Sequence, residues 1–225
     1  VDGTYPAEKR LPDERTMLKR YGVARTALRE AYGKLTDKGM IVARPKLGTS
    51  IRAQVHLNML DPDVLAWVLQ SRPLYEVAWG LYPLRRMIEP GAAALAAQLH
   101  TADDLLRIEA AYADMRLAVR DRKARIEADI RFHLEILTAT NNPFIRSFSA
   151  LLHTTMKETL VLGWRGTEAT SVVPARLLQH SDVLEAIRAR NPDMARMRME
   201  ILIDDSIKDI VAGLEADARA NSRAG

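Results

Sequence analysis

The sequence predicts a mainly α-helical protein, built from a small basic N-terminal unit and a larger, all-helical C-terminal unit. Apolar residues recur at spacings of three and four along most of the chain, and a strand-like pattern is confined to residues 40–52. The charge is also uneven, because residues 1–52 carry 12 Lys and Arg against 6 Asp and Glu, whereas the remainder carries 21 against 23. We therefore expect two domains with different partners, the first binding a polyanion; the plain alternative is a solvated basic face.

The composition is that of a folded protein, since 48% of the 225 residues are hydrophobic and 28% are charged. The absence of Cys excludes disulfides, thiolate nucleophiles and sulfur-ligated zinc sites, so any metal must use His and carboxylate ligands. No apolar run approaches the roughly 20 residues that a membrane helix requires. The first residues also lack a signal-peptide pattern. We therefore expect a cytoplasmic protein with no membrane partner.

Two short helices joined by a tight turn are predicted near the start of the chain. Asp13 is placed to cap a helix that runs to about Arg20, and Gly22 ends that helix. A second helix opens at Val23, and its apolar stripe comprises Val23, Ala27, Leu28, Ala31 and Leu35. Its opposite face carries Arg25, Thr26 and Arg29. This arrangement is typical of a helix-turn-helix, whose second helix enters the major groove of DNA.

A pair of short strands is predicted after the second helix. Residues 40–44 and 49–52 have strand-like composition and flank a turn at 45–48 that contains Pro and Gly. A strand pair in this position is the wing of a winged helix. We therefore place a winged helix-turn-helix DNA-binding domain at residues 1–53.

The order and spacing of a dozen residues in this segment resemble the winged-helix domain of the GntR family of transcription regulators. These residues are Leu11-Pro12, Glu14-Arg15, Gly22-Val23, Arg25-Thr26, Leu28-Arg29-Glu30-Ala31, Leu35, Gly39-Met40-Ile41 and Gly48-Thr49. The resemblance implies that Arg15, Arg25, Thr26, Arg29 and Gly48 approach DNA. Arg25 or Arg29 would hold guanine O6 and N7 in bidentate fashion, and Gly48 would let the wing backbone approach phosphate. Ala24 stands where the family commonly has Ser, so this position offers no hydroxyl to a phosphate.

The rest of the chain is predicted to be helical. A linker helix begins at Asp61-Pro62, within residues 54–74. Further helices are expected at about 73–98, 102–119, 124–139, 143–163, 173–190 and 192–219, with starts marked by Thr101, Asn142 and Pro192. These helices predict an all-helical bundle over residues 75–219, with any pocket built from side chains on facing helices.

One carboxylate and two imidazoles are candidates for a site inside this bundle. Asp129 and His133 are four residues apart, so they lie one turn apart on the same helix face. His180 lies on a later helix and would complete a three-residue cluster across the bundle. A pair with this spacing is more often a surface hydrogen bond than a ligand site.

Several motifs in the predicted bundle resemble the effector-binding and dimerisation domain of the FadR subfamily of GntR regulators. They are Arg85-Arg86-Met87-Ile88-Glu89-Pro90, Asp129-Ile130-Arg131-Phe132-His133, Asn142-Pro143-Phe144 and His180-Ser181-Asp182-Val183-Leu184-Glu185-Ala186-Ile187. The resemblance implies a cavity for a small carboxylate effector, and in metal-containing members one Asp and three His hold a divalent ion. Asp129, His133 and His180 match three of those positions, whereas the fourth is Leu202.

Two alternatives follow for this cavity. With a metal, zinc or a similar ion would have three protein ligands, and water or an effector oxygen would complete its coordination. Without a metal, Arg85, which matches the family's pocket-facing arginine, would clamp the effector carboxylate with two parallel hydrogen bonds. Asp129, His133 and His180 would then bind effector hydroxyls.

A sugar acid suits this set of side chains. Residues 60–69 and the loop at 163–169 also resemble galactonate-operon repressors of the subfamily. Trp164 in that loop either stacks on an apolar sugar face or fills a core or lid position.

The predicted function is that of a homodimeric transcription repressor, whose affinity for a double-stranded DNA operator is controlled by a small carboxylate such as a sugar acid. In such a dimer, two winged helices read related half-sites. The alternative from another class is a metal-dependent hydrolase or isomerase that uses Asp129, His133 and His180. No general acid–base pair or nucleophile accompanies these residues in the sequence, so we do not expect an enzyme.

Overall fold

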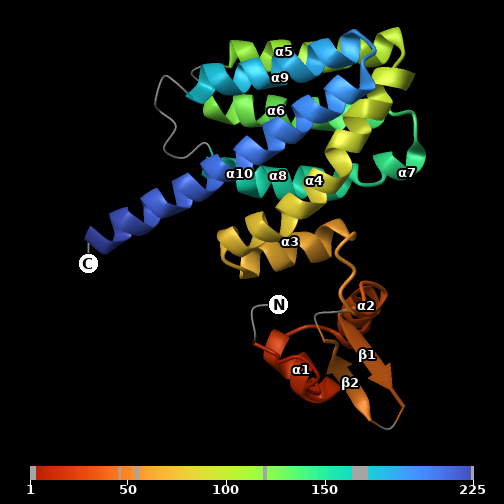
Figure 1. The fold of residues 1–225 in the computed structure, drawn as a ribbon. Helices are drawn as coiled ribbons and strands as arrows, with labels where there is room; N and C mark the ends of the chain where they lie inside the picture. The colour runs from red at the N-terminus through yellow and green to blue at the C-terminus, as the bar shows by residue number, and fades with distance from the viewer. Residues whose placement is uncertain (1–3, 46, 54–55, 119–120, 164–171, 224–225) are drawn as a thin grey trace. The chain divides into compact units, whose positions relative to one another are not determined.

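The computed structural model describes residues 4–45, 47–53, 56–118, 121–163 and 172–223. The chain divides into two compact units, Val1–Ser71 and Arg72–Gly225, and Figure 1 shows the fold of each. The first unit contains two short helices, a strand pair and a third helix: α1 (Glu14–Tyr21), α2 (Arg25–Asp37), β1 (Ile41–Arg44), β2 (Gly48–Ile51) and α3 (Pro62–Ser71). The predicted helix-turn-helix and wing are therefore both present.

The turn between α1 and α2 follows from local chemistry. Asp13 caps α1 as predicted, since its side chain accepts a hydrogen bond of 2.8 Å from the backbone N–H of Thr16. Gly22 ends α1 in the left-handed conformation with φ of 63°, which glycine adopts without strain. The prediction that α2 opens at Val23 is wrong by two residues, because Ala24 is extended and has no side chain that could cap the helix.

The apolar stripe predicted for α2 is only partly buried. Leu28 is buried, as are Met17 of α1 and Ile41 of β1, the two elements that α2 contacts. Val23 is 40% exposed because it lies in the turn before the helix, and Ala27 and Ala31 are exposed as well. Helix α2 is therefore buried mainly through the single side chain of Leu28 rather than along a continuous apolar stripe.

The wing is an antiparallel strand pair in which Ile41 lies opposite Ile51 and Arg44 lies opposite Gly48. The chain before α1 runs along the outer edge of β2, a feature that the sequence did not predict. The Leu11 N–H donates to the Thr49 carbonyl at 2.8 Å, and the Ile51 N–H donates to the Lys9 carbonyl at 3.0 Å. These bonds satisfy backbone groups that an edge strand would otherwise expose.

Helix α3 is attached to the end of α2 by a lysine. Asp61 caps α3 as predicted, accepting hydrogen bonds from the N–H groups of Asp63 at 3.0 Å and Val64 at 3.1 Å. Lys38, directly after α2, donates to both carboxylate oxygens of Asp61 at 2.8 Å and pairs with Asp63 at 2.8 Å. The linker is therefore a helix fixed to the winged helix rather than a flexible tether.

The second unit is an all-helical bundle, which confirms the predicted fold class (Figure 1). Its helices are α4 (Leu74–Leu99), α5 (Ala102–Leu117), α6 (Arg122–Thr138), α7 (Pro143–Arg146), α8 (Ser149–Gly163), α9 (Val172–Arg188) and α10 (Pro192–Arg223). Helix α10 packs along α4, and α6 packs against both α5 and α8. Thr101 and Asn142 cap helices as predicted, and Pro192 begins α10. Within the described residues, no helix is long and apolar enough to cross a membrane.

The single helix predicted over 143–163 is wrong, because the chain turns between α7 and α8. The Ser147 N–H is shared between the carbonyls of Pro143 and Phe144, and the Phe148 N–H donates to the Ile145 carbonyl at 3.1 Å. These tighter bonds close α7 after one turn. Ile145 and Phe148 then pack against a buried cluster of Ala92, Leu137 and Leu152. This packing offsets the free energy lost where the helix is interrupted. No Pro or Gly marks this corner in the sequence.

The main core of the bundle combines small and large side chains. Ala93, Ala96 and Ala97 give α4 a fully buried face that allows close approach of neighbouring helices. Phe132 of α6 is also fully buried, and its ring meets those of His133 and His180 edge-on, with centroid distances of 5.7 and 5.1 Å. The apolar core therefore fixes the orientation of the two predicted imidazoles.

Candidate functional site

The five residues predicted to approach DNA are all exposed on the first unit. Arg29 and Gly48 line one hollow of about 550 Å³ between α2, the wing and the start of α1. Gly48 has a φ of +81°, and a Cβ at this position would meet no atom within 4 Å. Glycine is needed there for its backbone conformation, and the open space leaves the wing accessible.

Arg25 is exposed but not unpaired, because its Nε lies 2.8 Å from Glu14 Oε1. This pair joins the start of α2 to the first turn of α1. Arg15 and Thr26 do not line the hollow. The structure therefore brings Arg29 and Gly48 together and holds Arg25 against an acidic neighbour.

Sequence reasoning missed two further residues of the hollow. Arg10 and Tyr32 both line it. The Tyr32 hydroxyl is buried and has no hydrogen-bond partner among the described residues. Burial of the ring raises the pKa of Tyr32. Arg10 belongs to the basic N-terminal charge, but only its bridge to Ser50 of β2 places it beside the wing.

The second unit gathers the predicted cluster. Asp129 and His133 of α6 and His180 of α9 are buried, and one ligand atom from each lies within 4.8 Å of the others. His133 Nε2 lies 3.3 Å from Asp129 Oδ1, and His180 Nε2 lies 3.2 Å from the same oxygen. Each imidazole therefore directs its Nε2 atom toward the Asp129 carboxylate.

The other nitrogen of each ring faces an outer acceptor. His180 Nδ1 lies 2.7 Å from the Arg176 carbonyl, which only accepts, so Nδ1 carries the hydrogen. His133 Nδ1 lies 2.5 Å from Glu89 Oε2, an ion-pair contact that is close but not aligned as a hydrogen bond. The hydrogen on His180 Nδ1 leaves the Nε2 lone pair of a neutral His180 ring directed at Asp129. That arrangement requires extra protons or a cation between these groups.

The electrostatics of the cluster fit this requirement. Burial raises the pKa of Asp129, but the charge of His180 and hydrogen bonds from His133 and His180 outweigh burial and hold the pKa well below its usual value. Burial lowers the pKa of His133, but the negative charge of Glu89 and the hydrogen bond to Asp129 outweigh burial. The pKa of His133 is therefore raised above its usual value. Asp129 Oδ2 is buried and has no hydrogen-bond partner among the described residues. One ligand oxygen is therefore available.

Arg85 is buried and paired within its own helix. Its Nε donates to Glu89 Oε1 at 2.6 Å, and its Nη2 donates to Oε2 at 3.4 Å. Burial opposes ionisation of Glu89, but the charges of Arg85 and His133 lower the pKa of this carboxyl to about 2. Glu89 was not among the predicted site residues, although its position four residues after Arg85 signals an ion pair.

Two predicted positions remain, Leu202 and Trp164. Leu202 lies on α10 within the main apolar core and is 2% exposed, so the fourth ligand position holds only hydrocarbon. Trp164 lies outside the described residues.

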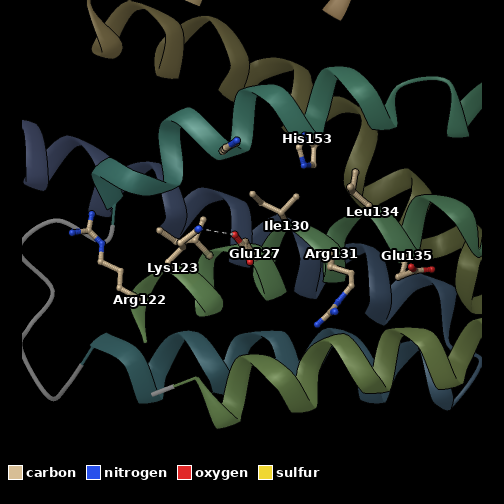
Figure 2. A pocket seen from close by; sticks show the side chains of 10 residues that line it. Arg122, Lys123, Glu127, Ile130, Arg131, Leu134, Glu135 and His153 are labelled. Carbon is tan, nitrogen blue, oxygen red and sulfur yellow. Dashed lines mark ion pairs between the residues drawn. The ribbon is translucent and has the colours of Figure 1, made fainter. Parts of the chain in front are cut away.

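A larger groove of about 830 Å³ lies elsewhere, between α6 and α8 (Figure 2). Its floor is the apolar stripe Ile126, Ile130 and Leu134, and its rim is mainly charged. Rim charges pair with each other or with α5, as in the contacts of Lys123 with Glu127 and of Arg131 with Asp114. Of the predicted effector residues that the structure describes, none lines this groove.

Comparison with known proteins decides the family. Residues 1–51 match the family model described as bacterial regulatory proteins of the gntR family, and residues 80–205 match the FCD domain. The chain belongs to the GntR family. It is a DNA-binding transcription regulator with an FCD effector-binding domain, not an enzyme, so the alternative of a hydrolase or isomerase is rejected.

Relatives of this GntR regulator agree with the assignment. It is 30% identical to the galactonate operon transcriptional repressor of Escherichia coli (strain K12), over 92% of this chain and 90% of that protein. It is 29% identical to the transcriptional regulator LutR of Bacillus subtilis (strain 168), over 92% and 93% of the two chains. The solved GntR structure from Streptococcus agalactiae has the same fold, with a TM-score of 0.54, 24% identity and 91% of each chain covered.

The uncapped start of α2 in this GntR regulator leads to a prediction. Ala24→Ser is expected to stabilise the first unit by about 0.5–2 kcal/mol, because a serine hydroxyl at this extended position accepts a bond from an N–H of the first turn. Urea unfolding measures the change. Ala27→Ser, the same substitution at an exposed interior position of α2, is the control and should not stabilise. Equal effects of the two substitutions would contradict the capping explanation.

Proposed function

We propose that this GntR regulator represses transcription as a homodimer, and that a small hydroxy acid releases it from its operator. The observation that carries the proposal is the buried cluster of Asp129, His133 and His180 beside Arg85, inside the segment that matches the FCD domain. A regulator of bacterial DNA acts in the cytoplasm, where that DNA lies. Its effector must bind the DNA-competent and DNA-incompetent arrangements unequally, since an equal affinity would shift nothing.

The operator is read by the exposed face of α2 and by the wing. Arg25 and Arg29 would contact guanine or phosphate, with Arg15, Thr26 and Gly48 contacting the backbone. The hollow supports this role, because Arg29 of α2 and Gly48 of the wing both line it and therefore lie on one surface. Two such surfaces in a dimer would bind a pseudo-palindromic site.

The cluster would hold one divalent ion such as Zn²⁺. Three observations support it: the ligand atoms converge, the Nδ1 atoms of both histidines face outer acceptors, and Asp129 Oδ2 has no partner among the described residues. Asp129, His133 and His180 would be the ligands, and the bound ion would supply positive charge for an effector oxygen. The position of Leu202 leaves further coordination to water or effector.

The effector is proposed to be a sugar acid such as galactonate. The E. coli relative is a galactonate operon repressor, and the cluster offers groups that bind hydroxyl and carboxylate oxygens. Arg85 would attract the carboxylate, although its guanidinium already binds Glu89 and would have to share or exchange that partner. Trp164 is proposed as a contact to the apolar face of the sugar.

The proposal is tested by selecting operator sequences from a random duplex pool and measuring gel shifts with the selected site. Galactonate is expected to release the DNA, whereas galactitol, which lacks the carboxylate, is not. Arg25→Ala and Arg29→Ala are expected to weaken binding by about 5- to 150-fold if each reads a base, the equivalent of about 1–3 kcal/mol.

Lys123→Ala, an exposed lysine of the other unit, is the control for these two substitutions. Unchanged affinity in both arginine variants would show that α2 does not read the operator. Release by galactitol, or by neither compound, would reject the sugar-acid effector while leaving DNA binding intact.

A further inference from the structure

A small cavity in the helical bundle has Arg85 in its lining. Residues from α4, α8 and α10 line it, including Tyr82, Arg85, Thr159, Ile203, Ser206 and Ile210. Its volume is about 10 Å³, which is the space of about one water molecule. The cavity therefore has room for little more than one water molecule, and its lining combines polar groups with isoleucines.

One polar group in this cavity, the Ser206 hydroxyl, lacks a hydrogen-bond partner among the described residues. Ser206 is 4% exposed, and its Oγ is buried without a hydrogen bond to any described residue. The other hydroxyls are engaged, because Thr159 donates to the Thr155 carbonyl at 2.9 Å and Tyr82 donates to Asp204 at 2.8 Å. An unpaired buried hydroxyl costs about 1–3 kcal/mol, so a water or a ligand atom must satisfy Ser206.

The position of Ser206 connects it to the effector cluster. It lies one helical turn after Leu202, which matches the fourth ligand position of the family, so the two share a face of α10. Arg85 lines the cavity and binds Glu89, and Glu89 contacts His133. The cavity is therefore joined to Asp129 and its histidines through an unbroken series of polar contacts.

We propose that Ser206 is an effector-binding residue, whose hydroxyl binds a hydroxyl or carboxylate oxygen at the end of the effector remote from Asp129. This rests on the proposed sugar-acid effector and adds a specificity determinant to it. The ligand oxygen would occupy the water-sized space next to Ser206, and Arg85 lines the same cavity. Because the cavity holds so little, a ligand there must also enlarge it, and α10 supplies half of the named lining residues.

A single-cysteine protein tests whether the ligand reaches this position. The chain has no Cys, so Ser206→Cys introduces one thiol of similar size. Methyl methanethiosulfonate is expected to modify this thiol at least about tenfold more slowly with saturating galactonate, the equivalent of about 1.4 kcal/mol of protection. Ser147→Cys, at an exposed serine after α7, is the control and should be modified equally with and without galactonate.

Calorimetry on the full chain tests the hydroxyl itself. Ser206→Ala is expected to weaken galactonate binding by about 2- to 12-fold, as for the loss of one hydrogen bond. Ser147→Ala is the control. A residue that only holds a structural water would change the unfolding temperature but not this affinity.

The outcomes separate this inference from the proposed function. Unchanged galactonate affinity in Ser206→Ala, with no protection of the cysteine, would overturn the role of Ser206 and leave the sugar-acid effector standing. If the wild-type protein binds no galactonate by calorimetry, the proposed effector and this contact are both rejected for that acid.

Discussion

Replacing Arg85 by Ala is expected to destabilise the helical unit by about 3–5 kcal/mol, because Glu89 would keep a buried charge without its partner. Glu89 is fully buried, and Arg85 is its 2.6 Å donor. For a chain of this size, such a loss lowers the unfolding temperature by roughly 10 °C. Chemical and thermal unfolding of the variant measure the effect directly.

Two further variants test whether the loss of stability comes from the unpaired charge of Glu89. Arg85→Met combined with Glu89→Gln removes both charges at nearly constant volume and should recover most of the lost stability. Arg86→Ala removes a neighbouring, half-exposed arginine that pairs with Glu200 and Asp204, and should cost about 1 kcal/mol or less. An Arg85→Ala protein as stable as the wild type would contradict the buried pair. The comparison also distinguishes a lost effector contact from a damaged fold.

Zn²⁺ is expected to stabilise the protein by about 2.7 kcal/mol when its free concentration is 100 times its dissociation constant. The gain arises because only the folded chain brings Asp129, His133 and His180 together. Asp129→Asn is expected to weaken Zn²⁺ binding by more than about 100-fold, since even changes to residues around the ligands reduce metal affinity by about 10- to 100-fold. Metal analysis and unfolding with and without a chelator measure both effects.

The control for this prediction is another histidine. His153 lies on α8 in the outer groove and is exposed, so His153→Ala should bind Zn²⁺ as the wild type does (Figure 2). Equal stabilisation of Asp129→Asn and the wild type by Zn²⁺ would show that the ion binds elsewhere. Loss of stabilisation in His153→Ala would assign it to the groove.

Features governed by adjacent residues were predictable. The capping side chains Asp13, Thr101 and Asn142 act on N–H groups within three residues of themselves, so sequence alone located these helix starts. The corner between α7 and α8 was not predictable, because it depends on the packing of Ile145 and Phe148 against a buried cluster that includes residues of α4 and α6. The local sequence favours helix on both sides of the break.

The candidate site shows the same division. The spacing of Asp129 and His133 indicated a shared helix face, and His180 on a later helix was expected to complete the cluster, an expectation that the family resemblance supported. Glu89 was missed because its contact with His133 joins α4 to α6, and no helical period relates residues on different helices. The pairing of Arg85 with Glu89 was readable from the spacing, but its burial depends on packing around it.

The pair between Glu14 and Arg25 has a consequence for how the regulator searches a chromosome. A protein that scans DNA meets far more wrong sites than right ones, and phosphate attraction acts at all of them. If Arg25 contacts DNA as proposed, Glu14 would reduce this attraction at every site, because it pairs with the Arg25 guanidinium at 2.8 Å. Only a site with a guanine that accepts two hydrogen bonds from Arg25 would replace the ion pair that Arg25 loses with Glu14. Under this proposal Glu14 would lower absolute affinity while shortening the time spent on random sequence, so that occupancy of the operator would depend less on how much competing DNA surrounds it.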